Sequence, residues 1–144
     1  MAKAPIVWRS MKQSAISKSS TEAEVASSSS CLDDVLWVRD LLKFFGFEQT
    51  SPTKFYMDNT AAINMIKNGN TTSRNKYFRV RTDSLHDAVV NQDIELHHMR
   101  SHQLPADALT KSLTGPQLKI FCSTVHIKQP STSKEGGATG ALPL

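Results

Sequence analysis

Apolar residues recur at three- and four-residue intervals over residues 19–45, which predicts one long amphipathic helix. Ser19 and Glu22 stand three residues apart at its start, as do Thr21 and Glu24, and this is the spacing of two overlapping capping boxes. Gly46 is the expected C-terminal stop. The buried stripe of this helix is predicted to consist of Val25, Leu32, Val35, Leu36, Leu42 and Phe45.

The rest of the chain alternates short apolar runs with helical patterns. Strands are expected in a β-hairpin over Pro5–Ile16, and over Lys54–Met57 and Ile94–Met99. Helices are expected over Thr60–Lys67, Lys76–Val90 (with Phe78, Leu85, Val89 and Val90 inward), Pro105–Leu113 and Pro116–Val125. A strand that runs into a helix with an acid at the junction is typical of α/β folds. We therefore predict an α/β domain with an α+β mixed sheet over residues 1–127, followed by a flexible tail over residues 128–144.

Basic residues are concentrated in one part of the chain. The net charge is +4, and the stretch from Asn59 to Thr82 contains five basic residues and no acid. Such a run is ordinarily a solvated surface, but it also suits a polyanionic partner. The candidate contacts to nucleic acid are Arg74, Lys76, Arg79 and Arg81.

The cysteines and the apolar runs of the chain indicate the cellular compartment in which the protein is expected. Two cysteines, Cys31 and Cys122, and no N-terminal apolar segment of signal-peptide length indicate free thiols in an intracellular protein, cytoplasmic or nuclear. No run approaches the roughly 20 apolar residues of a membrane span, so no membrane partner is expected.

Three acids stand at the starts or ends of predicted elements: Glu24, Asp58 and Asp107. Carboxylates that converge from such positions can hold hard divalent cations for phosphoryl-transfer chemistry. Each acid also has a structural explanation, because Glu24 can complete a capping box, Asp58 can belong to a turn and Asp107 can favour a helix N-terminus. Spacing alone leaves both interpretations open.

Five sequence words narrow the choice. They are SSTEAE (Ser19–Glu24), LWVRDLL (Leu36–Leu42), DNTAAI (Asp58–Ile63), SRNKYFRVR (Ser73–Arg81) and ADALTKSL (Ala106–Leu113). In this order and at about these separations, they resemble the motifs of ribonuclease H domains from copia-type LTR retrotransposons. The similarity extends from Pro5 to about Val125.

The resemblance implies a ribonuclease H-like fold, Mg²⁺ as the cofactor, and hydrolysis of the RNA strand of RNA–DNA hybrids by two-metal phosphodiester chemistry. Glu24, Asp58 and Asp107 would then be catalytic residues and metal ligands at three of the family's four carboxylate positions, with Glu22 as the alternative to Glu24. The implied partners are a hybrid or other nucleic acid and the reverse-transcriptase region upstream in the intact polyprotein.

Several positions depart from the family pattern. Val25 follows Glu24 directly where the family has Tyr, Tyr77 stands in place of His, and Thr82-Asp83 stands in place of Tyr-His. The family's first, central strand carries the fourth carboxylate and is expected upstream of Pro5, where only MAKA stands. Because that Asp would bridge both ions, we expect a fragment with weak or no autonomous activity.

Other interpretations remain open. The chain could be a non-catalytic nucleic-acid-binding relic of a retrotransposon polyprotein. Retroviral-type integrases share the carboxylate fold but carry their acids in the order Asp, Asp, Glu, whereas here Glu comes first. The spacings of His98, His102, Cys122 and His126 would allow a zinc site, although no Cys-x2-Cys pair is present. Alternatively, His102 could carry protons near Asp107.

Overall fold

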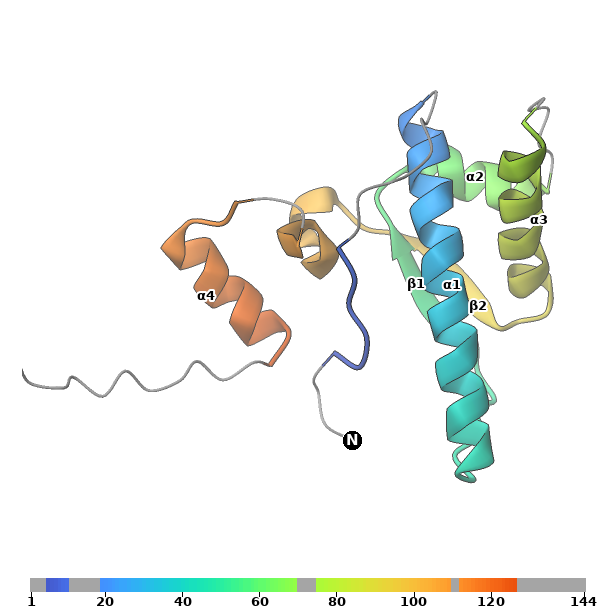
Figure 1. Ribbon diagram of the computed structural model, residues 1–144, viewed down its shortest axis with the longest axis horizontal. Coiled ribbons are helices and arrows are strands. Elements are labelled where there is room, and N and C mark those ends of the chain that lie inside the picture. The colour runs from blue at the N-terminus through green and yellow to red at the C-terminus, as the bar shows by residue number, and fades with distance from the viewer. Residues whose placement is uncertain (1–4, 11–18, 70–74, 110–111, 127–144) are drawn as a thin grey trace, which may run out of the picture.

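Figure 1 shows a computed structural model of the chain, which describes residues 5–10, 19–69, 75–109 and 112–126. Its longest element is helix α1 (Ser20–Phe44), close to the predicted bounds. The Ser19 hydroxyl accepts a hydrogen bond from the Glu22 backbone N–H at 3.1 Å, so the first of the two predicted caps is the one that starts the helix. Thr21 lies inside the first turn. After the helix, Gly46 adopts a left-handed φ of 81°, as expected of a glycine stop.

Strands β1 (Thr53–Met57) and β2 (Ile94–His98) form a parallel pair. Thr53 lies opposite Ile94, and Met57 lies opposite His98. Helices α2 (Thr60–Asn68) and α3 (Lys76–Val90) make the connection between the two strands. The α/β class is therefore confirmed, while the sheet formed by the described residues has two strands.

The core lies between the helices and one face of the sheet. Along β1 the buried Phe55 and Met57 alternate with the exposed Tyr56, so one face of the strand packs inward. Figure 1 shows α1 and α3 side by side, with their N-terminal ends both at the top of the view. The buried apolar residues are Val25, Leu32, Phe55, Met57, Ala62, Ile63, Ile66, Phe78, Leu85, Ala88, Ile94 and Leu96.

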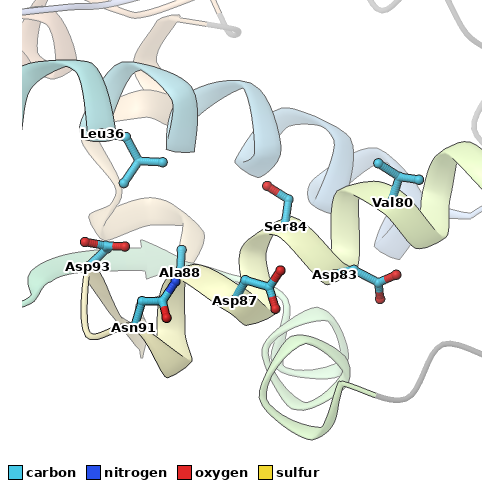
Figure 2. Close-up of a pocket in the computed structure, with 8 residues that line it drawn as sticks. All are labelled: Leu36, Val80, Asp83, Ser84, Asp87, Ala88, Asn91 and Asp93. Carbon is cyan, nitrogen blue, oxygen red and sulfur yellow. The ribbon is translucent and has the colours of Figure 1, made fainter.

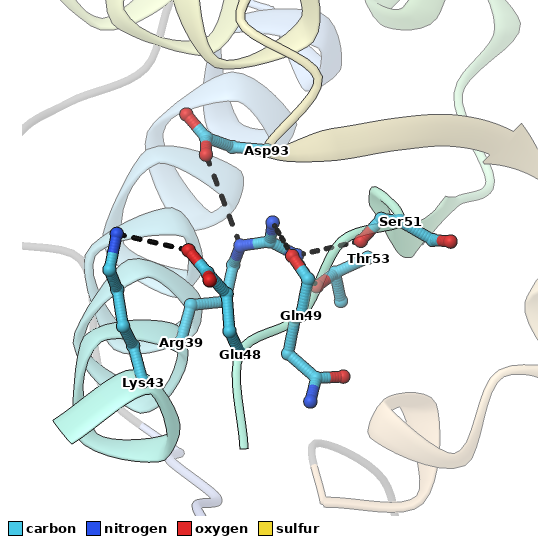
Figure 3. A network of polar contacts seen from close by, with 7 residues as sticks. All are labelled: Arg39, Lys43, Glu48, Gln49, Ser51, Thr53 and Asp93. Carbon is cyan, nitrogen blue, oxygen red and sulfur yellow. Dashed lines mark hydrogen bonds and ion pairs between the residues drawn. The ribbon is translucent and has the colours of Figure 1, made fainter. Parts of the chain in front are cut away.

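Arg39 connects α1 to the starts of both strands (Figure 3). Its guanidinium donates to the backbone carbonyls of Gln49 and Ser51 and to the Thr53 hydroxyl, each at 3.0 Å. It also lies 3.9 Å from the Asp93 carboxylate, just before β2. The planar, multiply donating guanidinium suits such a junction. Arg39 thus fixes where the sheet begins relative to the long helix.

The C-terminal part is arranged as short pieces. Two 3₁₀ turns, η1 (Ser101–Gln103) and η2 (Pro105–Leu109), precede helix α4 (Gly115–Thr124). Gln117 Oε1 accepts from the Thr114 backbone N–H at 3.0 Å and from the Thr114 hydroxyl at 2.9 Å, so the start of α4 is capped locally. Among the described helices, none combines the length and apolar content needed to cross a bilayer.

Several predictions about elements need correction. Pro5–Ser10, the described part of the predicted hairpin, contains no strand, and residues 11–16 lie outside the described residues. Phe45 and Val90 are exposed rather than buried because each stands at a helix end, beyond the reach of the core. Where a helix is predicted over Pro105–Leu113, Pro105–Leu109 form the 3₁₀ turn η2, in which Asp107 N–H bonds to Leu104 O, three residues back. Residues 110 and 111 lie outside the described residues. The predicted tail, residues 128–144, lies outside the described residues.

Candidate active site

Asp58 follows the last residue of β1, at the carboxyl end of the parallel pair. Its Oδ2 accepts a hydrogen bond from the Ser101 hydroxyl at 2.6 Å. His98, at the end of β2, places Nε2 3.2 Å from the Asp58 backbone oxygen. Hydrogen bonds to a carboxylate fix its orientation and are stronger than those between neutral groups. Ser101 therefore orients the Asp58 carboxylate where the two strands end.

Glu24 comes from the second turn of α1. The first turn of this helix contacts the residue after Asp58, because the Asn59 side-chain amide donates to the Thr21 hydroxyl at 3.4 Å. Partial burial raises the pKa of the Glu24 carboxyl above its ordinary value, and the nearby Asp58 charge raises that pKa further. A like charge has this effect only when the two groups are close and poorly screened. The structure therefore brings together two of the three carboxylates that the sequence nominates.

Glu22, the alternative to Glu24, has a different partner. Its Oε1 accepts a hydrogen bond from the Asn75 side-chain amide at 2.7 Å, at the N-terminus of α3. Because consecutive side chains on a helix diverge by about 100° per residue, Glu22 and Glu24 leave α1 in different directions. Of the two, Glu24 is thus the one placed beside Asp58.

Asp107 lies in η2, half-buried. Within residues 5–10, 19–69, 75–109 and 112–126, no group of three or more His, Cys, Asp or Glu side chains is arranged to hold a metal ion. Glu24, Asp58 and Asp107 therefore do not form a three-carboxylate cluster here, and the role of Asp107 stays a prediction. The same finding leaves the zinc alternative at His98, His102, Cys122 and His126 without support in this part of the chain.

The donor set decides what cation the pair could hold. Carboxylate oxygens are the ligands that Mg²⁺ prefers, and a cation between Glu24 and Asp58 would relieve the repulsion that raises the Glu24 pKa. Mg²⁺ binding by this pair stays a prediction. Two-metal centres need additional shared ligands, which the described residues do not gather at this place.

The candidate nucleic-acid contacts lie mostly on α3. Lys76, Arg79 and Arg81 are exposed along this helix, and its first turn contains no acid. Arg74 lies outside the described residues. Thr82, one of the departures from the family pattern, is fully buried and bonds to the Phe78 carbonyl at 3.0 Å. The exposed basic residues are therefore on a helix whose opposite face is firmly packed.

A separate pocket of about 460 Å³ lies between α1 and α3 (Figure 2). It is lined by Leu36, Val80, Asp83, Ser84, Asp87, Ala88, Asn91 and Asp93. Neither Glu24 nor Asp58 is among these residues. We therefore place the candidate active site at the half-buried Glu24–Asp58 pair rather than in this acidic pocket.

Sequence reasoning missed the residues that support the carboxylates. Ser101 lies outside the quoted motifs, and nothing in its sequence context indicates a contact with a residue 43 positions away. Asn59 and Asn75 precede predicted helices, so N-cap preference could have identified them as caps. Their side chains also reach α1, which no local pattern encodes.

Comparison with known proteins agrees with the motif series. The chain is 31% identical over 123 residues to the retrovirus-related Pol polyprotein from transposon RE1 of Arabidopsis thaliana. The corresponding polyprotein from transposon RE2 of the same plant is 32% identical over 123 residues. Each match covers 85% of this chain. The chain is homologous to a segment of transposon Pol polyproteins. A third relative, from transposon TNT 1-94 of Nicotiana tabacum, is 28% identical over 106 residues, which cover 74% of this chain.

The homology also has a limited span. The chain covers 8% of the length of each of these Pol polyproteins. No protein-family model matches the chain, and no solved structure matches it. The expected origin in a retrotransposon polyprotein is thus confirmed, while the assignment to the ribonuclease H domain stays a prediction.

Proposed function

We propose that this segment of a Pol polyprotein serves as part of a ribonuclease H domain that hydrolyses the RNA strand of RNA–DNA hybrids. The observation that carries the proposal is the pairing of Glu24 with Asp58 at the carboxyl end of the parallel strands. The five ordered motifs support the same assignment. Carboxylate pairs held at strand ends are suited to cation-assisted phosphodiester chemistry.

The side chains have distinct proposed roles. Glu24 and Asp58 would bind Mg²⁺, Ser101 would keep the Asp58 carboxylate oriented, and Asp107 would contribute in the intact domain. When bound, Mg²⁺ would supply activation of a water and stabilisation of the leaving oxygen. The exposed Lys76, Arg79 and Arg81 would contact backbone phosphates, which positions the hybrid without reading its sequence.

One observation favours a second, non-catalytic function for the chain by itself. The described residues gather two carboxylates and not a larger set, which suits one cation but not a two-metal centre. We therefore propose that residues 1–144 bind nucleic acid without cutting it, and that catalysis requires the preceding part of the polyprotein, including an Asp-bearing strand. The upstream reverse-transcriptase region is the proposed covalent partner.

The deciding experiment compares two lengths of the polyprotein on an RNA–DNA hybrid labelled on its RNA strand. Residues 1–144 should not cleave in Mg²⁺, whereas a form extended upstream through an Asp-bearing strand should. Asp58→Asn in the extended form should abolish cleavage while keeping a cooperative melt. Robust Mg²⁺-dependent cleavage by residues 1–144, lost on Asp58→Asn, would refute the division of function. Inactivity of every extended form would refute the ribonuclease assignment.

A further inference from the structure

Asn59 and Asn75 make the same pair of contacts at two different helices. Asn59 Oδ1 accepts from the Ala62 backbone N–H at 3.1 Å and so caps α2. Its Nδ2 donates to the Thr21 hydroxyl at 3.4 Å. Asn75 Oδ1 accepts from the Tyr77 backbone N–H at 3.1 Å at the start of α3, and its Nδ2 donates to Glu22 Oε1 at 2.7 Å. Each amide therefore caps its own helix and is bonded to the first turn of α1.

The chemistry of the amide explains why one side chain can do both. Asn carries an acceptor and a donor on the same planar group, whereas Ser, Thr or Asp can accept at an N-cap but offer no amide donor. The contact between Asn75 and Glu22 is the shorter of the two links and includes a carboxylate, which strengthens a hydrogen bond. It thus holds the N-termini of α1 and α3 together.

The first turn of α3 carries part of the proposed nucleic-acid contact. Lys76 directly follows Asn75, and Arg79 lies one turn further along. Glu22 lies two residues before Glu24 on α1. The Asn75–Glu22 bond therefore joins the basic turn to the helix turn that leads into the carboxylate pair.

We infer that Asn75 is a positioning residue for nucleic acid: its bond to Glu22 sets the distance between the basic first turn of α3 and the Glu24–Asp58 pair. This inference rests on the proposed binding of nucleic acid. It assigns to Glu22 a structural role that its charge alone would not suggest. A carboxylate near a phosphate backbone weakens binding by repulsion, whereas a carboxylate that anchors Asn75 strengthens it.

Two substitutions at position 22 separate these effects. Glu22→Gln removes the charge but keeps an oxygen acceptor for Asn75, while Glu22→Ala removes both. Both lose the same interaction with the dipole of α1, so the difference between them isolates the acceptor. The readout is the affinity of the full chain for an RNA–DNA hybrid at constant salt, by fluorescence anisotropy, at a temperature where circular dichroism shows every variant folded.

We expect Glu22→Gln to bind as well as or better than the wild-type chain, and Glu22→Ala to bind about fivefold more weakly than Glu22→Gln. Asn75→Ser, which keeps the cap but is too short to reach Glu22, should weaken binding by a similar factor. Adding Glu22→Ala to Asn75→Ser should then cause little further loss of affinity, because both changes remove the same hydrogen bond between Asn75 and Glu22.

The opposite results are equally informative. Equal affinity of Glu22→Ala and Glu22→Gln would overturn the positioning role and reduce Glu22 to a charge. Full additivity in the double variant would also overturn it. Failure of the wild-type chain to bind the hybrid at any salt concentration would instead overturn the proposed nucleic-acid function itself.

Discussion

At the scale of single residues, Glu24 links stability to pH. Its raised pKa means that the folded chain still holds a proton at pH values where the unfolded chain has released it. The stability that this group contributes is therefore fully present at pH values below its pKa in the unfolded chain, near 4.5. It is lost as the pH rises through the pKa in the folded chain. The loss occurs because the charged carboxylate is partly buried beside Asp58.

Glu24→Gln should remove this penalty. We expect the variant to be more stable than the wild-type chain at pH 7, with the difference shrinking towards pH 4. Urea unfolding between pH 4 and pH 8, without divalent cations, measures this difference. Asp58→Asn removes the like charge that helps to raise the Glu24 pKa, so the loss of stability with rising pH should shift towards lower pH in this variant. If the free energies of unfolding of Glu24→Gln and the wild-type chain differed by the same amount from pH 4 to pH 8, Glu24 would not link stability to pH.

Gly69 is a second residue whose replacement has a defined cost. It ends α2 with a left-handed φ of 63°, and a Cβ there would lie 2.9 Å from His86 Nε2. The ring cannot withdraw freely, because His86 Nδ1 lies 2.8 Å from the Ile66 carbonyl oxygen. We expect Gly69→Ala to lower the free energy of unfolding by about 1–3 kcal/mol.

Gly46→Ala is the matched control for this measurement. Its φ of 81° imposes the same type of backbone strain, but no atom lies within 4 Å of the added Cβ. Urea unfolding of both variants should therefore show a larger loss at Gly69. Equal losses would show that the contact with His86 contributes nothing.

At the scale of elements, Arg39 determines how α1 meets the sheet. Its side chain is 16% exposed and bonds to the segment entering β1 and approaches Asp93 before β2. Arg39→Ala would remove three hydrogen bonds, one of them to the part-buried Thr53 hydroxyl, so we expect a loss of about 1–3 kcal/mol by urea unfolding. Lys43→Ala, which removes the exposed ion pair with Glu48, should cost less than about 1 kcal/mol. A reversed order would contradict the role of Arg39.

The elements also show what could be predicted from local pattern. Strands β1 and β2 and helices α1, α2 and α3 were predicted to within two residues, because caps, glycine stops and apolar period act over short distances. The pattern failed at Phe45 and Val90, where burial depends on what lies across from the helix end. It also failed over Pro105–Leu109, where the chain forms a 3₁₀ turn rather than the predicted α-helix.

The candidate site divides in the same way. Glu24 and Asp58 could be identified as candidates from the ordered motifs. The effect of the Asp58 charge on the Glu24 pKa is consistent with that choice. Ser101 and the dual role of Asn75 could not, because each contact joins residues more than 40 positions apart. Supporting contacts of this kind depend on how finished elements pack, and no local sequence pattern contains that information.

At the scale of the whole molecule, the exposed basic residues of α3, Lys76, Arg79 and Arg81, predict salt-dependent binding of a hybrid. Each phosphate contact releases condensed counterions, so Arg79→Ala should reduce the slope of log affinity against log salt by about one unit. Arg74→Ala, at a position outside the described residues, should do the same. Lys119→Ala, at an exposed position on α4, is the control and should leave the slope unchanged. An unchanged slope in all three variants would show that the basic residues of α3 are an ordinary solvated surface and do not contact the hybrid.

The two strands of the described sheet could pair with further extended segments at their outer edges. In the part of the chain that the structure describes, β1 and β2 pair only with each other, so within this part the outer side of each strand has no strand partner. An open edge pairs with any extended segment it meets, including one from another molecule. A segment tethered in the same polypeptide competes at an effective concentration on the order of millimolar. An extended segment joined to this chain in one polypeptide would therefore reach such an edge ahead of a segment from a second molecule.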